Sequence, residues 1–262
     1  MEHRKVLFTL TIPTFNEEKN IRIPLDSAYD LVDEVLIVDG GSTDKTIQIA
    51  KSYGSKIRIL SVDNPPNFLV NKQRAIDNAK GDWILQLDAD ERLSPELKEE
   101  IENWKPARPA GGLKIENSVS GYWIPRKNWF LGRYLMKGGV YPDGVLRLYR
   151  RGKAHFKLEN VHENTIVDGK TAWTTNAIEH MADPTFARYI ERWHRYNTFD
   201  AQQLVKKGEK PCLPCYLVGK PILTFLSIYL RHKGFMDGWP GFVWAFFSSI
   251  RYGEIYFKAR NQ

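Results

Sequence analysis

The chain has 262 residues, of which 42% are hydrophobic and 26% are charged, fractions that are ordinary for a globular protein and exclude a disordered one. Its length suits one α/β domain with an appendage better than two independent domains. The net charge of +7 is unevenly distributed, because the stretch from Arg188 to the end has twelve Lys or Arg against five Asp or Glu. The first 187 residues are therefore neutral, and only the C-terminal part is built to meet an anionic partner.

The two cysteines, Cys212 and Cys215, form a lone C-x-x-C sequence. A structural zinc site needs four ligands and no matching pair exists, so we expect packing cysteines in a reducing compartment. The N-terminus enters a strand pattern without a cleavage-site region, so no signal peptide is predicted. No apolar stretch reaches about eighteen residues, because Lys220 and several Pro and Gly interrupt the candidates, and no spanning helix is expected.

Strand and helix patterns alternate along the first hundred residues. Apolar and β-branched runs predict strands at 6–12, 35–38, 57–62 and 83–87. Helical patterns follow the first three strands: one opens after Asn16, and the others cover 45–53 and 71–80. This alternation predicts an α/β fold with a doubly wound, mostly parallel sheet, whose ligands bind at the carboxyl ends of the strands.

The fourth strand runs directly into three carboxylates, Asp88, Asp90 and Glu91. Asp88 and Asp90 would share a face of a strand, and two anions held that close repel unless a cation lies between them. Oxygen ligation by few protein groups suits Mg²⁺ or Mn²⁺, which also bind the phosphates of a substrate. The alternative is that the two residues cap the next helix, but Ser94 and Pro95 already do so, which favours the metal site.

The glycines at 40 and 41 do not have the spacing of the G-x-G-x-x-G or G-x-x-x-x-G-K loops that cradle phosphates. A dehydrogenase or a P-loop enzyme is therefore disfavoured. A fold that holds a nucleotide diphosphate through a metal and carboxylates fits the sequence better.

Three segments, 12–18, 38–46 and 87–91, resemble in order and spacing the successive signatures of family 2 glycosyltransferases with the GT-A fold. The resemblance covers roughly the first hundred residues. It implies a nucleotide-sugar donor whose ribose lies near Asp88 and whose diphosphate is held by a metal on Asp90. It also implies a nucleoside pocket lined by Pro13, Phe15, Glu17 and Asp39, with Lys72 beside the base or a phosphate.

One departure from the family pattern follows Asp39. Many relatives have Asp-Asp-Gly-Ser where this chain has Asp39-Gly40-Gly41-Ser42, so a carboxylate that often contacts the base is missing. A UDP-sugar remains the favoured donor. For Asp44, at the end of the same turn, we expect turn chemistry instead of a role in the site.

Beyond Trp104 the alternation stops, and strand-like runs at 121–130 and 145–150 are rich in aromatic and basic side chains. Such side chains stack on sugars and bases alike; with the resemblance, we expect a glycan acceptor and no nucleic acid. We divide the chain into a nucleotide-sugar-binding α/β half (1–104), an acceptor-binding part of the same catalytic domain (105–185) and a basic, amphipathic helical extension (186–262).

Sugar transfer with inversion needs a carboxylate that takes the proton of the acceptor hydroxyl. Glu163 is the candidate base, with Asp143 next, and the triplet Val161-His162-Glu163 resembles that of the lipopolysaccharide core glucosyltransferase branch. His162 is the candidate second metal ligand and His180 its alternative. For either histidine, a hydrogen-bonded structural imidazole is the competing interpretation.

The C-terminal part begins with a predicted helix from Arg188 to Lys207, followed by apolar runs at 221–230 and 239–247 with basic flanks. Trp-containing apolar runs with basic flanks are typical of a segment lying on an anionic membrane. The alternative is a helical hairpin packed on the catalytic domain.

The sequence thus predicts an inverting, metal-dependent glycosyltransferase that acts on a lipid-linked glycan such as lipopolysaccharide core. We expect it in the cytoplasm, peripheral on the inner face of the cytoplasmic membrane. One alternative is a polyprenyl-phosphate sugar synthase, whose phosphate acceptor needs no general base. The alternative of another class is a non-catalytic module that binds glycan or nucleotide.

Overall fold

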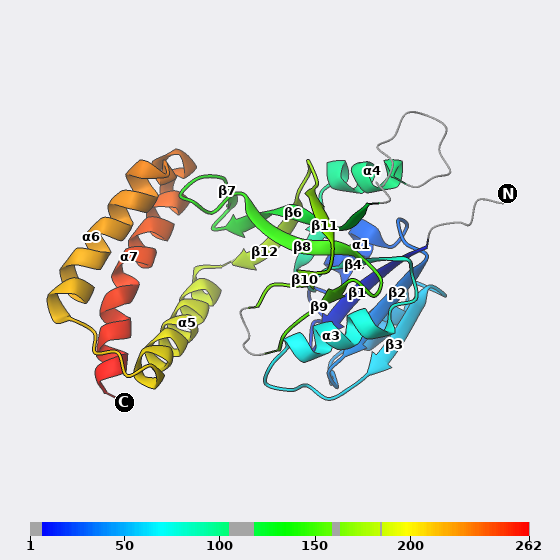
Figure 1. Cartoon of the computed structure of the whole chain (residues 1–262), viewed down its shortest axis with the longest axis horizontal. Helices are drawn as coiled ribbons and strands as arrows, with labels where there is room; N and C mark the ends of the chain where they lie inside the picture. Colours follow the sequence, from blue (N-terminus) through cyan, green and yellow to red (C-terminus); the bar gives the residue numbers. More distant parts are fainter. Residues whose placement is uncertain (1–6, 105–117, 159–162, 184, 262) are drawn as a thin grey trace. The chain divides into compact units, whose positions relative to one another are not determined.

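The computed structural model describes residues 7–104, 118–158, 163–183 and 185–261 (Figure 1). The chain divides into two compact units. The first consists of 1–126 and 143–180, and the second of 127–142 and 181–262. Each unit has its own apolar clusters.

The first unit is built on four parallel strands in the order β3-β2-β1-β4. Their bounds are β1 (Phe8–Thr14), β2 (Glu34–Asp39), β3 (Ile57–Ser61) and β4 (Trp83–Gln86), and the helices of this part are α1 (Arg22–Ala28), α2 (Thr46–Lys51), α3 (Leu69–Asn78) and α4 (Pro95–Asn103). Almost every residue of β1, β2 and β4 is buried. Runs buried on both faces are typical of parallel strands, and the predicted α/β fold is confirmed.

β1 extends two residues beyond its predicted end, through Pro13 to Thr14. Both residues pair with β2, opposite Val38 and Asp39. On the other side of β1, the pairing with β4 covers only Phe8 to Thr11. A proline is tolerated here because its missing N–H faces no partner strand, and the extension brings the loops after β1 and β2 to the same edge.

The sheet continues in the order β4-β8-β6-β12-β5 and is mixed, because β4 with β8, β8 with β6 and β12 with β5 pair antiparallel. The bounds are β5 (Glu91–Leu93), β6 (Val119–Phe130), β8 (Asp143–Arg150) and β12 (Ile178–Asp183); β7 (Arg133–Leu135) and β11 (Lys170–Trp173) also pair with β6, and β9 (Ala154–His155) pairs with β10 (Ile166–Val167) in a small second sheet. β5, which begins at the predicted carboxylate Glu91, pairs with β12.

Gly81 holds the start of β4 close to β1. Its N–H donates to Thr9 Oγ1 over 2.8 Å, and a Cβ at this position would lie 2.6 Å from the backbone nitrogen of Thr9. Thr9 Oγ1 in turn donates to Oε2 of Glu34 in β2 over 2.7 Å. Only a residue without a side chain permits this approach, which ties the starts of three neighbouring strands together.

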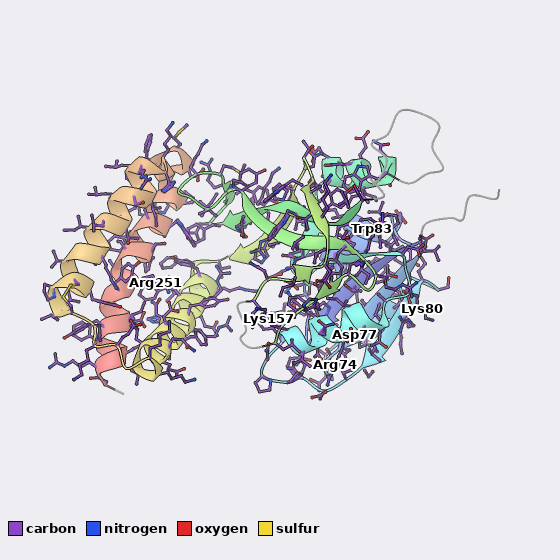
Figure 2. All side chains as sticks on the ribbon, viewed as in Figure 1. Arg74, Asp77, Lys80, Trp83, Lys157 and Arg251 are labelled. Carbon is purple, nitrogen blue, oxygen red and sulfur yellow. A yellow bond between two sulfur atoms is a disulfide. The ribbon has the colours of Figure 1, made fainter. Side chains whose placement is uncertain are left out.

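The second unit contains the helical extension. Its elements are α5 (Phe186–Lys206), η1 (Cys215–Gly219), α6 (Lys220–Phe225), η2 (Leu226–Arg231), η3 (Gly234–Asp237) and α7 (Gly238–Arg260). Within this unit α7 contacts both α5 and α6 (Figure 1). Arg251 of α7 points toward α5 (Figure 2), where it donates to Asn197 Oδ1 over 3.1 Å and pairs with Asp200.

Cys212 and Cys215 form a disulfide, so the prediction of reduced packing cysteines is wrong. Both residues are exposed, and their Cα atoms lie 5.2 Å apart at the entry to η1, within the range that a disulfide spans. The C-x-x-C spacing is compatible with a disulfide as well as with a zinc site or free thiols.

Within the described ranges, no helix combines the length and the apolar character that crossing a membrane requires.

Candidate active site

The loops after β1 and β2 are joined into one surface by hydrogen bonds. Asn16, which has a φ of 56°, donates its N–H to Ser42 Oγ (2.9 Å) and accepts the N–H of Thr43 on Oδ1 (2.8 Å). The N–H of Glu17 donates to Thr46 Oγ1 over 2.7 Å. Since both loops leave the carboxyl ends of adjacent parallel strands, they form a fixed part of the edge where such sheets bind ligands.

Asp39 organises the turn that follows β2. Its buried carboxylate accepts the N–H groups of Gly41 (3.2 Å) and Ser42 (3.1 Å). Gly41 has a φ of +86°, in the left-handed region that favours glycine. Asp39 therefore shapes the loop, and its predicted contact with a nucleoside stays a prediction. Asp44 accepts the N–H groups of Glu18 and Thr46, as the expectation of turn chemistry implied.

The other residues predicted to line the nucleoside pocket lie on the same edge. Pro13 lies in β1. Phe15 is the first residue after this strand and is 44% exposed. The carboxylate of Glu17 accepts from Asn20 Nδ2 over 2.7 Å. An exposed aromatic ring at a strand end can stack on a nucleobase, which is the role predicted for Phe15.

Asp88 is held between two buried cations. Lys72 Nζ lies 2.6 Å from Asp88 Oδ1, and Arg147 Nη2 lies 2.6 Å from Asp88 Oδ2. Both cations are less than 10% exposed, whereas the Asp88 side chain is 28% exposed. Burial raises the pKa of Asp88, but Arg147 and Lys72 outweigh it, so the pKa lies far below its ordinary value. The carboxylate is therefore charged and fixed in orientation.

Lys72 does not lie on a solvated face of its helix. It is buried on α3, with its ammonium 5.3 Å from the centre of the Phe68 ring. Burial and then the nearby Arg147 lower the pKa of Lys72, while Asp88 opposes them. The negative charge of Asp88 thus compensates for the burial of the Lys72 ammonium.

Glu91 extends this cluster to two arginines that sequence reasoning missed. Its fully buried carboxylate lies 2.9 Å from Arg147 Nη2 and 3.0 Å from Arg126 Nη1. Arg126 also pairs with Asp143, Nη2 to Oδ2 at 2.6 Å. Asp143 had been considered only as an alternative base. One feature of the sequence could have indicated this cluster, because Arg147 interrupts the apolar run 145–148. An arginine buried in such a strand needs anionic partners.

Asp90 lies beside a histidine from a distant strand. Its Oδ2 is 3.5 Å from Nε2 of His180, which β12 places opposite Glu91 of β5. A carboxylate and an imidazole are both ligands for divalent metals. Among the residues that the structure describes, no three His, Cys, Asp or Glu side chains form a metal-holding group. Asp90 and His180 fit a metal that takes its remaining ligands from water and a diphosphate.

The remaining predicted residues come from the segment between β9 and β10. His162 lies outside the described residues. Glu163 is partly buried and precedes Ile166, the first residue of β10. Its role as the base stays a prediction.

The model of the family described as Glycosyl transferase family 2 matches residues 9–165, a range that contains Asp88, Asp90, Arg147 and Glu163. The chain belongs to glycosyl transferase family 2. The resemblance of the three motifs is thereby confirmed, and this family 2 member is a glycosyltransferase.

One relative of this family 2 glycosyltransferase is named for the biosynthetic process in which it acts. The lipopolysaccharide core biosynthesis glycosyltransferase LpsC of Rhizobium meliloti (strain 1021) is 29% identical over 240 residues, 87% of this chain and 85% of LpsC. An uncharacterized glycosyltransferase of Rickettsia typhi is 27% identical over 266 residues, 95% of this chain and 88% of the relative. Among solved structures, S. aureus TarS 1-349 in complex with UDP-GlcNAc matches with a TM-score of 0.48 and 16% identity, over 97% of this chain and 88% of that one.

Proposed function

We propose that this glycosyltransferase moves a sugar, with inversion, from a nucleotide-sugar donor to a lipid-linked glycan such as lipopolysaccharide core. The observation that carries the proposal is the pairing of Asp88 with Lys72 and Arg147 beside Asp90 and His180, at the sheet edge of a family 2 member. The similarity to LpsC supports the acceptor class. We take a UDP-sugar as the donor to test first.

Asp88 would bind the donor's ribose. A carboxylate has about four lone-pair directions, and Lys72 and Arg147 leave room for a hydroxyl donor on its exposed side. Because both cations also fix its rotamer, Asp88 needs no reorganisation when the donor arrives. Such preorganisation favours binding of the donor in the geometry that reacts.

The divalent metal, Mg²⁺ or Mn²⁺, would be held by Asp90 together with His180, or with His162, which lies outside the described residues. When bound, it supplies Lewis-acid stabilisation of the charge on the departing diphosphate.

Glu163 would act as the general base. Its carboxylate takes the proton of the acceptor hydroxyl, while the hydroxyl oxygen bonds to the anomeric carbon from the face opposite the nucleoside diphosphate. The bond between the anomeric carbon and the diphosphate oxygen breaks, and its electron pair leaves with the diphosphate. Inversion follows from this single displacement.

We further propose that the second unit contacts an anionic membrane. Trp239, Phe246, Ile250 and Phe257 are all exposed on α7 at spacings of seven, four and seven, which places them on one face of the helix. A second exposed stripe on α6 and η2 consists of Ile222, Leu226 and Leu230. Basic side chains at the ends of these helices complete the pattern of an interfacial surface: Lys220, Arg231, Lys233, Lys258 and Arg260.

Two measurements test the proposed activity. The first titrates a panel of nucleoside diphosphates by calorimetry with Mg²⁺ or Mn²⁺; we expect UDP to bind only with metal. The second follows radiolabelled sugar from UDP-sugars onto purified lipopolysaccharide core. If no nucleoside diphosphate binds with either metal, the protein is a non-catalytic module and the proposal is wrong.

A further inference from the structure

The aromatic pair Trp123 and Trp173 lies outside the cluster described above. The two indoles stack with ring centroids 5.7 Å apart and an interplanar angle of 22°. Trp173 is 57% exposed, the most exposed of the large apolar side chains described in the first unit. An aromatic ring of this size and exposure offers an apolar surface on which a ligand can stack.

The register of β11 against β6 shows which face of the sheet carries the pair. Ala172 lies opposite Tyr122, and Trp173 lies opposite Trp123. Tyr122 and Ala172 pack into the main core. Because successive side chains of a strand alternate between faces, Trp123 and Trp173 project from the opposite face.

Gly144 of β8 leaves room for the outer edge of the Trp173 indole on this face. A Cβ at Gly144 would be 2.3 Å from Cη2 and 3.0 Å from Cζ3 of Trp173. Since β6 lies between β11 and β8 at this point, the indole reaches across one strand to cover the backbone of the next.

The pair lies near the segment that carries Glu163. Gly121, two residues before Trp123 on the same face, is covered by Val167 of β10; a Cβ on Gly121 would be 3.1 Å from Val167 Cγ1. Glu163 precedes Val167 by four residues, which span at most about 14 Å of extended chain. A glycan of several sugars can therefore extend from Glu163 to the pair.

We propose that Trp173, backed by Trp123, is a stacking platform for a distal pyranose of the acceptor glycan. This inference rests on the proposed function. The apolar face of a pyranose covers an indole, and the large exposed fraction of Trp173 leaves area for such a contact. A nucleic acid would also stack there, but residues 1–187 have no net charge, which disfavours a polyanion.

The test uses the full-length protein and a lipid-free lipopolysaccharide core oligosaccharide released by mild acid. Trp173→Ala and Gly144→Ala, whose Cβ would displace the indole, should each raise KM for the oligosaccharide about tenfold or more, while KM for the UDP-sugar stays unchanged. Trp173→Phe should recover most of the affinity. Tyr196→Ala, which removes an exposed aromatic ring of α5, is the matched control.

A direct binding measurement separates this proposal from the proposed function. Titration of ¹⁵N-labelled protein with the same oligosaccharide should move the indole N–H resonance that disappears in Trp173→Ala. If the Trp173 resonance shifts but no sugar is transferred, the proposed activity is contradicted and the stacking platform is supported. Transfer by wild type with an unchanged oligosaccharide KM in Trp173→Ala, or an unshifted Trp173 resonance at saturating oligosaccharide, would overturn the platform.

Discussion

Nε2 of His180 lies 3.5 Å from Oδ2 of Asp90, although the two residues lie far apart in the sequence, His180 at the end of the first unit and Asp90 near its middle. The antiparallel pairing of β12 with β5 brings them together. If they hold the metal, both Asp90→Ala and His180→Ala should weaken Mn²⁺ binding in the presence of UDP. We expect Asp90→Ala to remove it, because the carboxylate supplies the charge.

Electron paramagnetic resonance of Mn²⁺ at fixed UDP measures this binding. Arg92→Ala, an exposed neighbour on β5, serves as the control for general damage to the strand. Native Mn²⁺ affinity in Asp90→Ala would show that the metal lies elsewhere.

The second prediction concerns Glu163→Gln. Glutamine keeps the size and hydrogen bonding of the side chain but cannot accept the proton, so transfer should fall by roughly a hundredfold or more while UDP still binds. Single-turnover transfer and calorimetry with UDP measure the two effects. A fully active variant would favour a polyprenyl-phosphate acceptor, since a phosphate needs no base.

The third prediction concerns the stability provided by Arg147. Arg147→Met leaves Asp88 and the fully buried Glu91 without their shared cation, which should reduce the free energy of unfolding by about 3–5 kcal/mol. Urea denaturation followed by circular dichroism measures it. Adding Glu91→Gln should restore part of the loss.

Arg58→Met provides the matched comparison, because the Arg58 side chain is 31% exposed in its pair with Glu34. Losing that more exposed pair should cost about 1 kcal/mol or less. Equal losses in the two variants would contradict a special role for the buried cluster.

The fourth prediction concerns the exposed stripes of the second unit. Ile222 is 54% exposed and Trp239 is 69% exposed, and replacing either by Glu should reduce sedimentation with anionic vesicles. Each basic residue near such a surface contributes about 1 kcal/mol, so high salt should also release the protein. Val205→Glu adds the same charge to α5 and should bind as wild type does. Equally weak wild-type binding to anionic and neutral vesicles would refute the membrane contact.

The fifth prediction concerns pH and Glu254, which joins α7 to α5. Burial raises the pKa of Glu254, but hydrogen bonds from Lys258, Asn197 and His194 outweigh it, and the pKa is lowered from 4.5. A carboxyl group with a lowered folded-state pKa stabilises the protein above its unfolded pKa and loses this effect as the pH falls through the folded value. The helical unit should therefore become less stable in acid.

Thermal unfolding of wild type and Glu254→Gln between pH 7 and pH 3 checks this expectation. The difference between the two melting temperatures should be largest near neutrality and shrink below about pH 4.5. Glu209→Gln, at an exposed carboxylate of the same unit, is the control. A difference that is constant across the range would exclude Glu254 as the source.

The parallel half of the sheet was predictable because its strands are continuous apolar runs, and the runs ended near Asp39 and Asp88 as the structure has them. The pairing of Lys72 with Asp88 is consistent with the site that the motifs predicted. Arg126 and Arg147 were not foreseen as parts of the cluster. Their partners lie on strands that meet through antiparallel pairing, and long-range pairing of this kind leaves no local signal in the sequence.

The pairing of Cys212 with Cys215 was missed for a different reason. The choice between thiols and a disulfide depends on the conformation of the turn, which spacing alone does not give. His180 entered only as an alternative ligand, since nothing local links β12 to the carboxylates after β4.

Gly81 bears on how variants of this protein should be interpreted. Any side chain there would push on Thr9 and so shift β4 relative to β1, moving Asp88 and Asp90 away from the loop that carries Phe15. A survey of substitutions scored by sugar transfer would therefore flag Gly81 among the most sensitive positions, although it contacts no substrate. Sensitivity at this glycine would report the alignment of the two strands that carry the chemistry.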